Sequence, residues 1–498
     1  MENTVIDREE QQQQEVKHVS VREQMAFNAS ALLRDMSRGL FIGQLQTFWI
    51  MVMGNDALMM GPLQVLQRIW DGFTDPAVGA YFDRQTYTTE KARRFFKKTA
   101  IPLTVLLVLM FLPIRFHAQD SINVLLHMGF IMLLYLPFDP MESLNGTAFH
   151  SYYNSITPNV QERNGVIARS RMFSSLGGAA VGGIPMIFGW FTSGPDDVAG
   201  RTRIFMIAVA VVGVAFLLYN LLMYTQVKER IVSPPQTQQQ KILRIFRGLL
   251  KNRLFLILVL SNTIGGIINR GGTDVFLFEY NLGDISWHGY VGLIGGFPAL
   301  LIATWLMPKL CQWFEKRDIV IGSSIARLII RGTFLFMGTR PGMFNLTGVN
   351  TAMSARLFFT ASAFLNEIPN AVRGQLYWSM LADSVDYGEW KTGKRNDGVV
   401  YTTEGLMGKL IGSVGAMSTG IILRTLGFVE QAPAQSARTM HGLFVVPMVI
   451  ELISITCSTI PFFFWNVTRK QHAQVIADIA ARNETVADTA AEEPVEAA

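Results

Sequence analysis

The feature that most constrains this chain is a series of long apolar windows that recurs along its whole length, separated by short polar gaps. Clear examples are residues 101–114, 204–224 and 441–465. A membrane-spanning helix needs about 20 mostly apolar residues. Of the 498 residues, 50% are hydrophobic and 16% are charged, whereas soluble domains carry roughly 25% charged residues. The sequence therefore predicts an all-α polytopic membrane protein.

Hydropathy places twelve spans in the chain, six on each side of its longest internal polar stretch. The spans are expected near residues 30–54, 57–82, 99–116, 122–149, 166–192, 203–225, 252–279, 287–313, 319–339, 354–382, 398–426 and 441–466. The polar stretch contains the run SPPQTQQQK, which is typical of a semi-extended linker. Two six-helix halves of this kind enclose a central cavity and expose it to each side of the membrane in turn.

The expected organisation has five parts. They are a cytoplasmic N-terminal tail 1–28, an N-terminal six-helix half 29–225, a cytoplasmic linker 226–251, a C-terminal six-helix half 252–466 and a cytoplasmic C-terminal tail 467–498. Lys and Arg residues concentrate after even-numbered spans, which places both termini in the cytoplasm. The Gln-rich N-terminus has no apolar core of the kind found in cleaved signals. We therefore expect a multi-pass protein of the cell inner membrane.

The sequence disfavours several classes of function. It contains no HExxH, P-loop or GxSxG pattern, so catalysis has no visible machinery. Cys311 and Cys457 lie in or beside apolar helices, where a thiol behaves as a small hydrophobe. The net charge of +5 follows the membrane topology and is a poor argument for nucleic acid. We expect no enzymatic activity, no metal, no cofactor and no nucleic-acid partner.

The second span carries charged residues at a predicted membrane depth, where ionisable groups are functional candidates by default. Arg68, Asp71 and Asp75 are spaced i, i+3 and i+7 and share one helical face. Two carboxylates one turn apart repel when both are ionised, which favours the uptake of a proton or another cation. The pattern suits a coupling-cation site, with Arg68 beside it as a candidate contact for substrate. A structural Arg/Asp cluster that joins helices is the alternative.

Three runs in order along the chain resemble one family of carriers. They are RIWDGFTDPAVGAYFDR in the second span, SITPNVQERNGVIARSRMF at residues 155–173 and LADSVDYGEWKTGKRNDGVVYTTEGLMGKLIGSVGA at residues 381–416. The chain resembles the glycoside-pentoside-hexuronide:cation symporters, typified by the melibiose carrier, a branch of the major facilitator superfamily. This resemblance implies the major facilitator fold with 12 transmembrane helices in two six-helix halves, and it indicates no particular substrate.

The resemblance also implies roles for individual residues. Asp71 and Asp75 match the paired cation-binding aspartates of the family. Arg171 matches an arginine on the fifth helix that contacts sugar, and Lys409 matches a lysine near the cavity on the eleventh helix. Trp378 lies close to the position of a family aromatic on the tenth helix, where it could stack on a sugar ring.

The fourth predicted helix departs from the family pattern. His150 stands where the melibiose carrier has a third carboxylate, and Asn154 stands where it has a tryptophan that stacks on sugar. Because imidazole titrates near neutral pH, a place for His150 in the cation site favours H+ over Na+ as the coupling ion. A polar cavity residue with no coupling role is the alternative for His150.

The first predicted helix departs as well. Asp35 is the carboxylate nearest to the position of the family's sugar-recognising aspartate, and it either replaces that residue or pairs with Arg34 or Arg38 at the membrane surface. Trp49 shares a face with Gln46, so the two offer a sugar an apolar ring and an amide. Packing within the helix bundle is the alternative for Trp49.

Two further groups of charges are candidates. Arg270 and Asp274 have i, i+4 spacing that allows them to neutralise each other. Any cavity arginine left unpaired would favour an anionic substrate such as a uronate, because guanidinium binds carboxylate bidentately. In the loops, the resemblance implies gating by Asp83 with Arg84 and by Asp386 with Arg395.

The sequence thus predicts a symporter that imports a sugar, glycoside, oligosaccharide or sugar acid by alternating access, driven by a cation gradient. The expected partners are that small-molecule substrate and membrane lipid, and we expect the protein to function as a monomer. A carrier of the same fold that moves an amphiphile such as a lysolipid is the alternative.

Overall fold

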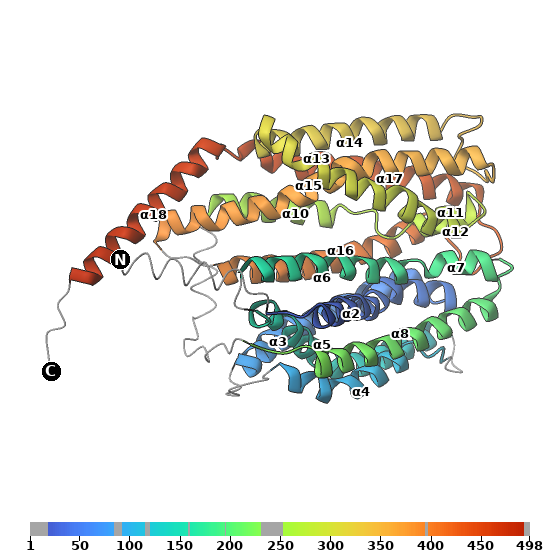
Figure 1. Ribbon diagram of the computed structural model, residues 1–498. Helices are drawn as coiled ribbons and strands as arrows, with labels where there is room; N and C mark the ends of the chain where they lie inside the picture. The colour runs from blue at the N-terminus through green and yellow to red at the C-terminus, as the bar shows by residue number, and fades with distance from the viewer. Residues whose placement is uncertain are drawn as a thin grey trace. The chain divides into compact units, whose positions relative to one another are not determined.

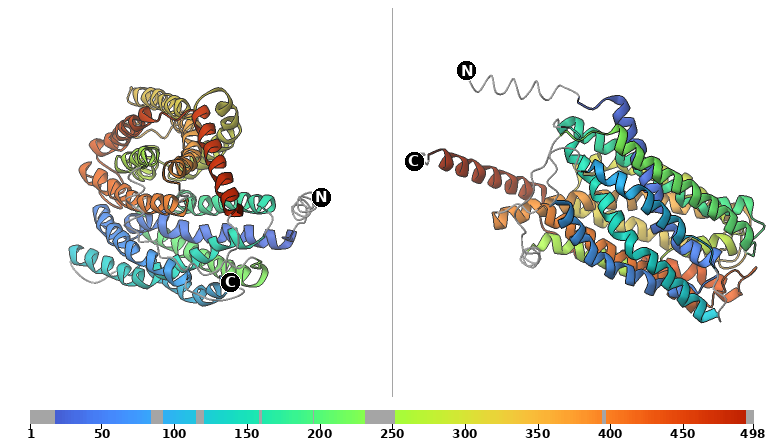
Figure 2. Two further views of the ribbon diagram at one scale, coloured as in Figure 1. Left: turned by 90° about the vertical axis from the view of Figure 1, so that its left-hand side faces the viewer. Right: turned by 90° about the horizontal axis from the view of Figure 1, so that it is seen from below.

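The computed structural model shows a helical protein that divides into two compact units (Figure 1). It describes residues 18–83, 92–114, 120–157, 160–194, 196–230, 252–393 and 397–492. The first unit comprises residues 1–239, 284–289 and 423–435, and the second comprises residues 240–283, 290–422 and 436–498. In each unit the long helices run roughly alongside one another (Figure 2).

The first unit is built from long helices with few breaks. They are α2 (Val21–Thr47), which continues into the π-helical turn Phe48–Val52, then α3 (Met60–Asp83), α4 (Arg93–Met110), α5 (Asp120–Ser155), α6 (Val160–Gly182), α7 (Ile184–Phe191) and α8 (Val198–Gln226). Ser20 starts α2 as an N-cap, because its hydroxyl accepts a hydrogen bond from the Glu23 amide. Helices α2, α6 and α8 pack together, and α3 packs against α5.

The second unit contains most of the remaining helices. They are α10 (Arg253–Ile267), α11 (Asp274–Tyr280), α12 (Ser286–Tyr290), α13 (Phe297–Trp313), α14 (Lys316–Gly338), α15 (Met353–Thr392), α16 (Asp397–Thr425), α17 (Ala437–Thr459) and α18 (Arg469–Glu492). Residues 286–289 of α12 and residues 423–425 of α16 are grouped with the first unit. Helix α15 packs against α10, α13 and α14, and α17 packs against α10 and α14.

Six helical stretches among the described residues are long and apolar enough to cross a membrane. They are Ile122–Tyr153, Gly165–Phe191, Val198–Gln226, Ser286–Trp313, Lys316–Gly338 and Ala437–Phe464. Other long helices carry several charges, such as Arg34 and Asp35 in α2. Most of the predicted linker 226–251 lies outside the described residues, so the division into two six-helix halves stays a prediction.

Helices α2 and α6 approach closely because Gly177 has no side chain. A Cβ atom at Gly177 would lie 2.1 Å from the backbone oxygen of Leu32. Nearby, a Cβ atom at Gly39 would lie 3.6 Å from the Cα atom of Gly178. The contact brings two backbones together, as small residues do in membrane helix pairs.

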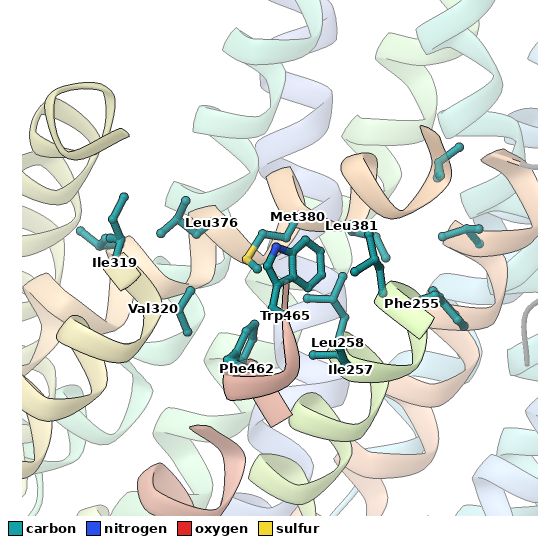
Figure 3. Close-up of a cluster of buried hydrophobic side chains, with 14 of the residues drawn as sticks. Phe255, Ile257, Leu258, Ile319, Val320, Leu376, Met380, Leu381, Phe462 and Trp465 are labelled. Carbon is teal, nitrogen blue, oxygen red and sulfur yellow. The ribbon is translucent and has the colours of Figure 1, made fainter. Parts of the chain in front are cut away.

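A hydrophobic cluster holds one end of the second unit together (Figure 3). Trp465 and Phe462, which follow α17, lie against Leu258 of α10 and Met380 of α15 in this cluster. Trp465 is 2% exposed. Three segments far apart in the sequence are therefore joined by burial of apolar surface.

The carboxylate of Glu162 at the start of α6 fixes the first described residues. It accepts hydrogen bonds from the amides of His18 (3.1 Å) and Val19 (2.9 Å) and from the Thr157 hydroxyl (2.6 Å). Partial burial alone would raise the pKa of Glu162, but these hydrogen bonds outweigh it and hold the pKa below its usual value.

Helix α18 lies within residues 467–498, which the sequence predicts to be a cytoplasmic C-terminal tail. It packs against α15, where the Trp390 indole donates a hydrogen bond to Asp478 (2.9 Å). The side chains of its last turns lie outside the described residues.

Candidate functional site

Helix α3 presents Asp71 to α5 as a buried carboxylate that is only 2% exposed. Arg68, one turn earlier, donates to Asp71 from Nη1 over 2.8 Å. The hydroxyl of Tyr135 on α5 also donates a hydrogen bond to Asp71. The i, i+3 spacing seen in the sequence therefore forms a real ion pair, and α5 closes over it.

Helix α5 contributes a second buried carboxylate, Asp139, which is 5% exposed. The hydroxyl of Thr74 on α3 donates to Asp139 Oδ2. The Tyr135 hydroxyl lies 3.4 Å from Asp139 Oδ1 and also contacts Asp71. The two carboxylates therefore share one phenol.

Asp75 lies one turn after Asp71 on α3 and faces α5 as well. Its Oδ1 accepts a hydrogen bond from the Ser143 hydroxyl over 2.5 Å. We call Asp71, Asp75 and Asp139 the carboxylate cluster. Ser143 is four residues beyond Asp139, so both lie on nearly the same face of α5.

Asp71 and Asp139 differ in whether a positive side chain compensates their negative charge. Arg68 pairs with Asp71, whereas the recorded partners of Asp139 are the neutral hydroxyls of Thr74 and Tyr135. A buried carboxylate without a cation is strongly disfavoured in its ionised form. Asp139 is therefore suited to carry a proton or to share a cation with Asp71.

The structure does not bring His150 to the carboxylate cluster. His150 lies eleven residues after Asp139 on the same helix, which is about 16 Å along the axis at 1.5 Å per residue. Its recorded ring contacts are with Phe149 and Tyr153, at centroid distances of 5.7 and 5.5 Å. The side chain of the nearby Asn154 lies outside the described residues.

Asp35 adopts the paired arrangement that the sequence left as one alternative. Its Oδ1 lies 3.4 Å from Nη1 of Arg34, and the Ser174 hydroxyl of α6 donates to its other oxygen. Arg34 also lies 3.9 Å from Glu142 of α5. Arg171 is exposed on α6.

Trp49 is packed inside the first unit and is 0% exposed. Its indole nitrogen donates to the Asp56 carbonyl over 2.9 Å, and its ring stacks on His127 at a centroid distance of 5.1 Å. The structure therefore places Trp49 within the helix bundle, which is the packing alternative.

The second unit contains a polar cavity of about 690 Å³. Trp378 lines it and is 55% exposed, with its ring edge-on to Tyr377 at 5.8 Å. Tyr377 donates a hydrogen bond to Glu404 over 3.1 Å, and Asn262 donates to the same carboxylate over 3.4 Å. The side chain of Lys409 lies outside the described residues.

Arg270 forms the predicted pair with Asp274, at 2.5 Å between Nη1 and Oδ1. It also lies 3.4 Å from Glu451 of α17. Glu451 in turn contacts Arg327 (3.3 Å) and Arg331 (3.1 Å) of α14. One buried carboxylate therefore joins three arginines from two segments of the chain.

The proposed gating residues are only partly described. Asp386 lies 3.3 Å from His472 of α18, and Lys316 of α14 pairs with Asp383 at 2.6 Å. Arg84, Arg395 and the side chain of Asp83 lie outside the described residues. Gating by these residues stays a prediction.

Four buried charged residues were not predicted as site residues from the sequence, namely Asp139, Arg327, Arg331 and Glu451. Each lies inside an apolar window, so the rule that intramembrane charges are functional candidates would have marked it. Their partners come from other helices, which no local pattern reveals.

Known proteins are similar to this chain over most of its length. Residues 34–469 match the family model described as MFS/sugar transport protein. A Salmonella typhimurium protein named "Putative 2,3-dihydroxypropane-1-sulfonate exporter" is 27% identical, with 93% of this chain and 97% of that protein covered. The isoprimeverose transporter of Lactiplantibacillus pentosus is 24% identical, with coverage of 92% and 91%. The inward-open structure of the xylose transporter XylE from E. coli aligns with a TM-score of 0.55 at 13% identity, covering 91% of this chain and 98% of that one.

Proposed function

Because the chain belongs to the MFS/sugar transport protein family, we propose that it is a secondary active transporter that imports a sugar, glycoside or sugar acid together with a cation. The family consists of transporters rather than enzymes. The observation that carries the proposed coupling is the carboxylate cluster, in which Asp139 has neutral partners beside the Asp71 and Arg68 ion pair.

The carboxylate cluster suits coupling because its net charge changes when a proton or another cation binds. When Asp139 is ionised, two carboxylates share one phenol and one guanidinium, and their repulsion favours binding of a positive ion. Binding of a cation reduces this negative charge in an apolar surrounding. A conformational step that requires the reduced charge would then occur after the cation has bound, which links its downhill entry to movement of the solute.

The contacts favour H+ over Na+ as the coupling ion. Oxygens of Asp139, Thr74 and Tyr135 lie in direct hydrogen-bond contact. A bound ion between them would hold the oxygens apart, whereas a proton sits within a hydrogen bond. The preference for H+ thus depends on Asp139 and not on His150, which lies outside the cluster.

The relatives and the cavity of the second unit both indicate the class of substrate. One relative is named for the sugar isoprimeverose and another for a sulfonate with two hydroxyl groups. The cavity is lined largely by polar and charged side chains, and its volume is within the usual range for small ligands, roughly 300–1,000 Å³. This lining favours a polar solute over the acyl chain of a lysolipid.

The test is uptake into proteoliposomes that contain the purified protein. A panel of neutral sugars and sugar acids is offered under an inward pH gradient, an inward sodium gradient, or neither. We expect accumulation of at least one solute under the pH gradient. Asp75→Asn should abolish accumulation and retain exchange of solute across the membrane. Equal uptake with and without every ion gradient would exclude symport.

A further inference from the structure

The cavity of the second unit is lined by four arginines, and three of them pair with carboxylates. Arg270, Arg327 and Arg331 all lie within 3.4 Å of Glu451, and Arg270 pairs with Asp274 as well. These contacts draw on α11, α14 and α17 and fix one wall of the cavity.

The fourth arginine, Arg373 of α15, has a different environment. Its recorded partners are the hydroxyls of Ser261 (3.2 Å) and Ser458 (3.0 Å), the Ser458 carbonyl (3.4 Å) and the face of the Phe462 ring (5.9 Å). None of these partners is a carboxylate. Among the described residues, Arg373 is therefore the cavity arginine whose charge no acidic side chain offsets.

All the recorded hydrogen bonds of Arg373 use Nη2. A guanidinium group has five N–H donors in a planar fork, so most of them remain to be used. The two serines are themselves tied together, because Ser261 donates to the Ser458 carbonyl over 2.6 Å. Arg373 is thus held through Nη2, and the residue lines the cavity.

Other side chains in the cavity are suited to the remainder of a sugar-like molecule. Asn262, Asn366 and Asn370 supply amides that can bind hydroxyl groups. Trp378 supplies an apolar ring face for a carbon skeleton. An anionic group at one end and hydroxyl groups along a short skeleton would match this arrangement.

We infer that the cavity binds a polyhydroxylated acid, a sugar or short polyol with one carboxylate or sulfonate group, and that Arg373 anchors the anion. The inference rests on the proposed transport function and specifies its substrate class. Charge-assisted bidentate contacts are among the strongest that a guanidinium makes, so the anion would add more to binding than any single hydroxyl group.

The test measures equilibrium binding to purified protein in detergent by calorimetry, without any ion gradient. The probes are two matched pairs, D-glucuronate with D-glucose and 2,3-dihydroxypropane-1-sulfonate with glycerol. We expect the acid of at least one pair to bind about tenfold or more tightly than its neutral partner, the range of a charged hydrogen bond. Arg373→Gln should remove this preference and Arg373→Lys should keep part of it.

Arg340→Gln is the matched control, because Arg340 is exposed after α14 and stacks on Phe336 at 4.5 Å, away from the cavity lining. This variant should keep the wild-type preference. The inference is overturned if neither acid binds better than its neutral partner in the wild-type protein, or if folded Arg373→Gln keeps the preference. If acids bind through Arg373 and no ion gradient drives uptake, the proposed symport fails and the anion site stands.

Discussion

Asp139 on α5 accepts a hydrogen bond from the hydroxyl of Thr74 on α3, so a carboxylate from one helix completes a polar cluster centred on another. This contact places a third acidic group beside the aspartates of α3, where the sequence comparison expected a histidine. The physical consequence is a buried site whose charge can be changed by one proton.

The first prediction concerns coupling through Asp139. At zero membrane potential, a pH gradient of one unit can sustain at most about tenfold accumulation of a solute that enters with one proton. We expect wild-type proteoliposomes to approach this ratio and Asp139→Asn to fall to a ratio of about one, because the amide cannot release or take up the proton. Exchange of labelled solute should continue in the variant.

Asp318→Asn provides the control for this measurement. Asp318 is an exposed residue of α14 that pairs with its neighbour Arg317 at 3.0 Å. The control should accumulate solute as the wild type does. Full accumulation by Asp139→Asn would remove Asp139 from the coupling mechanism.

The second prediction separates His150 from coupling. Because His150 lies about three turns beyond Asp139 on α5, His150→Gln should keep gradient-driven accumulation and the same dependence on external pH. Uptake measured between pH 5 and pH 8 checks this. A loss of the pH response in the variant, with unchanged exchange, would return His150 to the cation site.

The third prediction concerns the contact between α2 and α6. Gly177→Leu would force a side chain against the backbone of Leu32, and overpacking of this kind costs about 1–3 kcal/mol. Thermal unfolding followed by tryptophan fluorescence should show a lower midpoint. Gly182→Ala should change it little, since no atom lies within 4 Å of a Cβ there. Equal thermal unfolding midpoints for the two variants would show that α2 and α6 accommodate the larger side chain without a loss of stability.

The fourth prediction concerns pH and Glu162. Its pKa is lower in the folded protein than the usual 4.5, so its contribution to stability is present above that usual value. The contribution is lost as the pH falls through the folded-state pKa. Hydrogen–deuterium exchange of the peptide containing His18 and Val19, corrected for the intrinsic effect of pH, should rise only at acidic pH.

Glu162→Gln supplies the comparison for that experiment. The glutamine side chain is neutral at every pH. Hydrogen–deuterium exchange of the same peptide in this variant should therefore already be faster at pH 7 and should not increase further at acidic pH. An identical acid step in both proteins would mean that another group controls this segment.

Local patterns determined a large part of this protein. Hydropathy predicted an all-α membrane protein, and three motifs predicted the cation symporter family; the family and the major facilitator fold are both confirmed by the comparisons. The i, i+4 spacing of Arg270 and Asp274 correctly predicted their ion pair. These features follow from the sequence because the helical period and local apolarity depend only on residues near in the chain.

Only the tertiary structure decided which charged side chains of different helices contact one another. Asp139 meets Asp71 through Tyr135, and Glu451 meets Arg331 across two helices. The same packing enclosed Trp49. Such contacts depend on the rotation and depth of one helix against another, which arise from the fit of many side chains over long sequence separations. The residues themselves are visible in the sequence, and their partners exist only once the helices have packed.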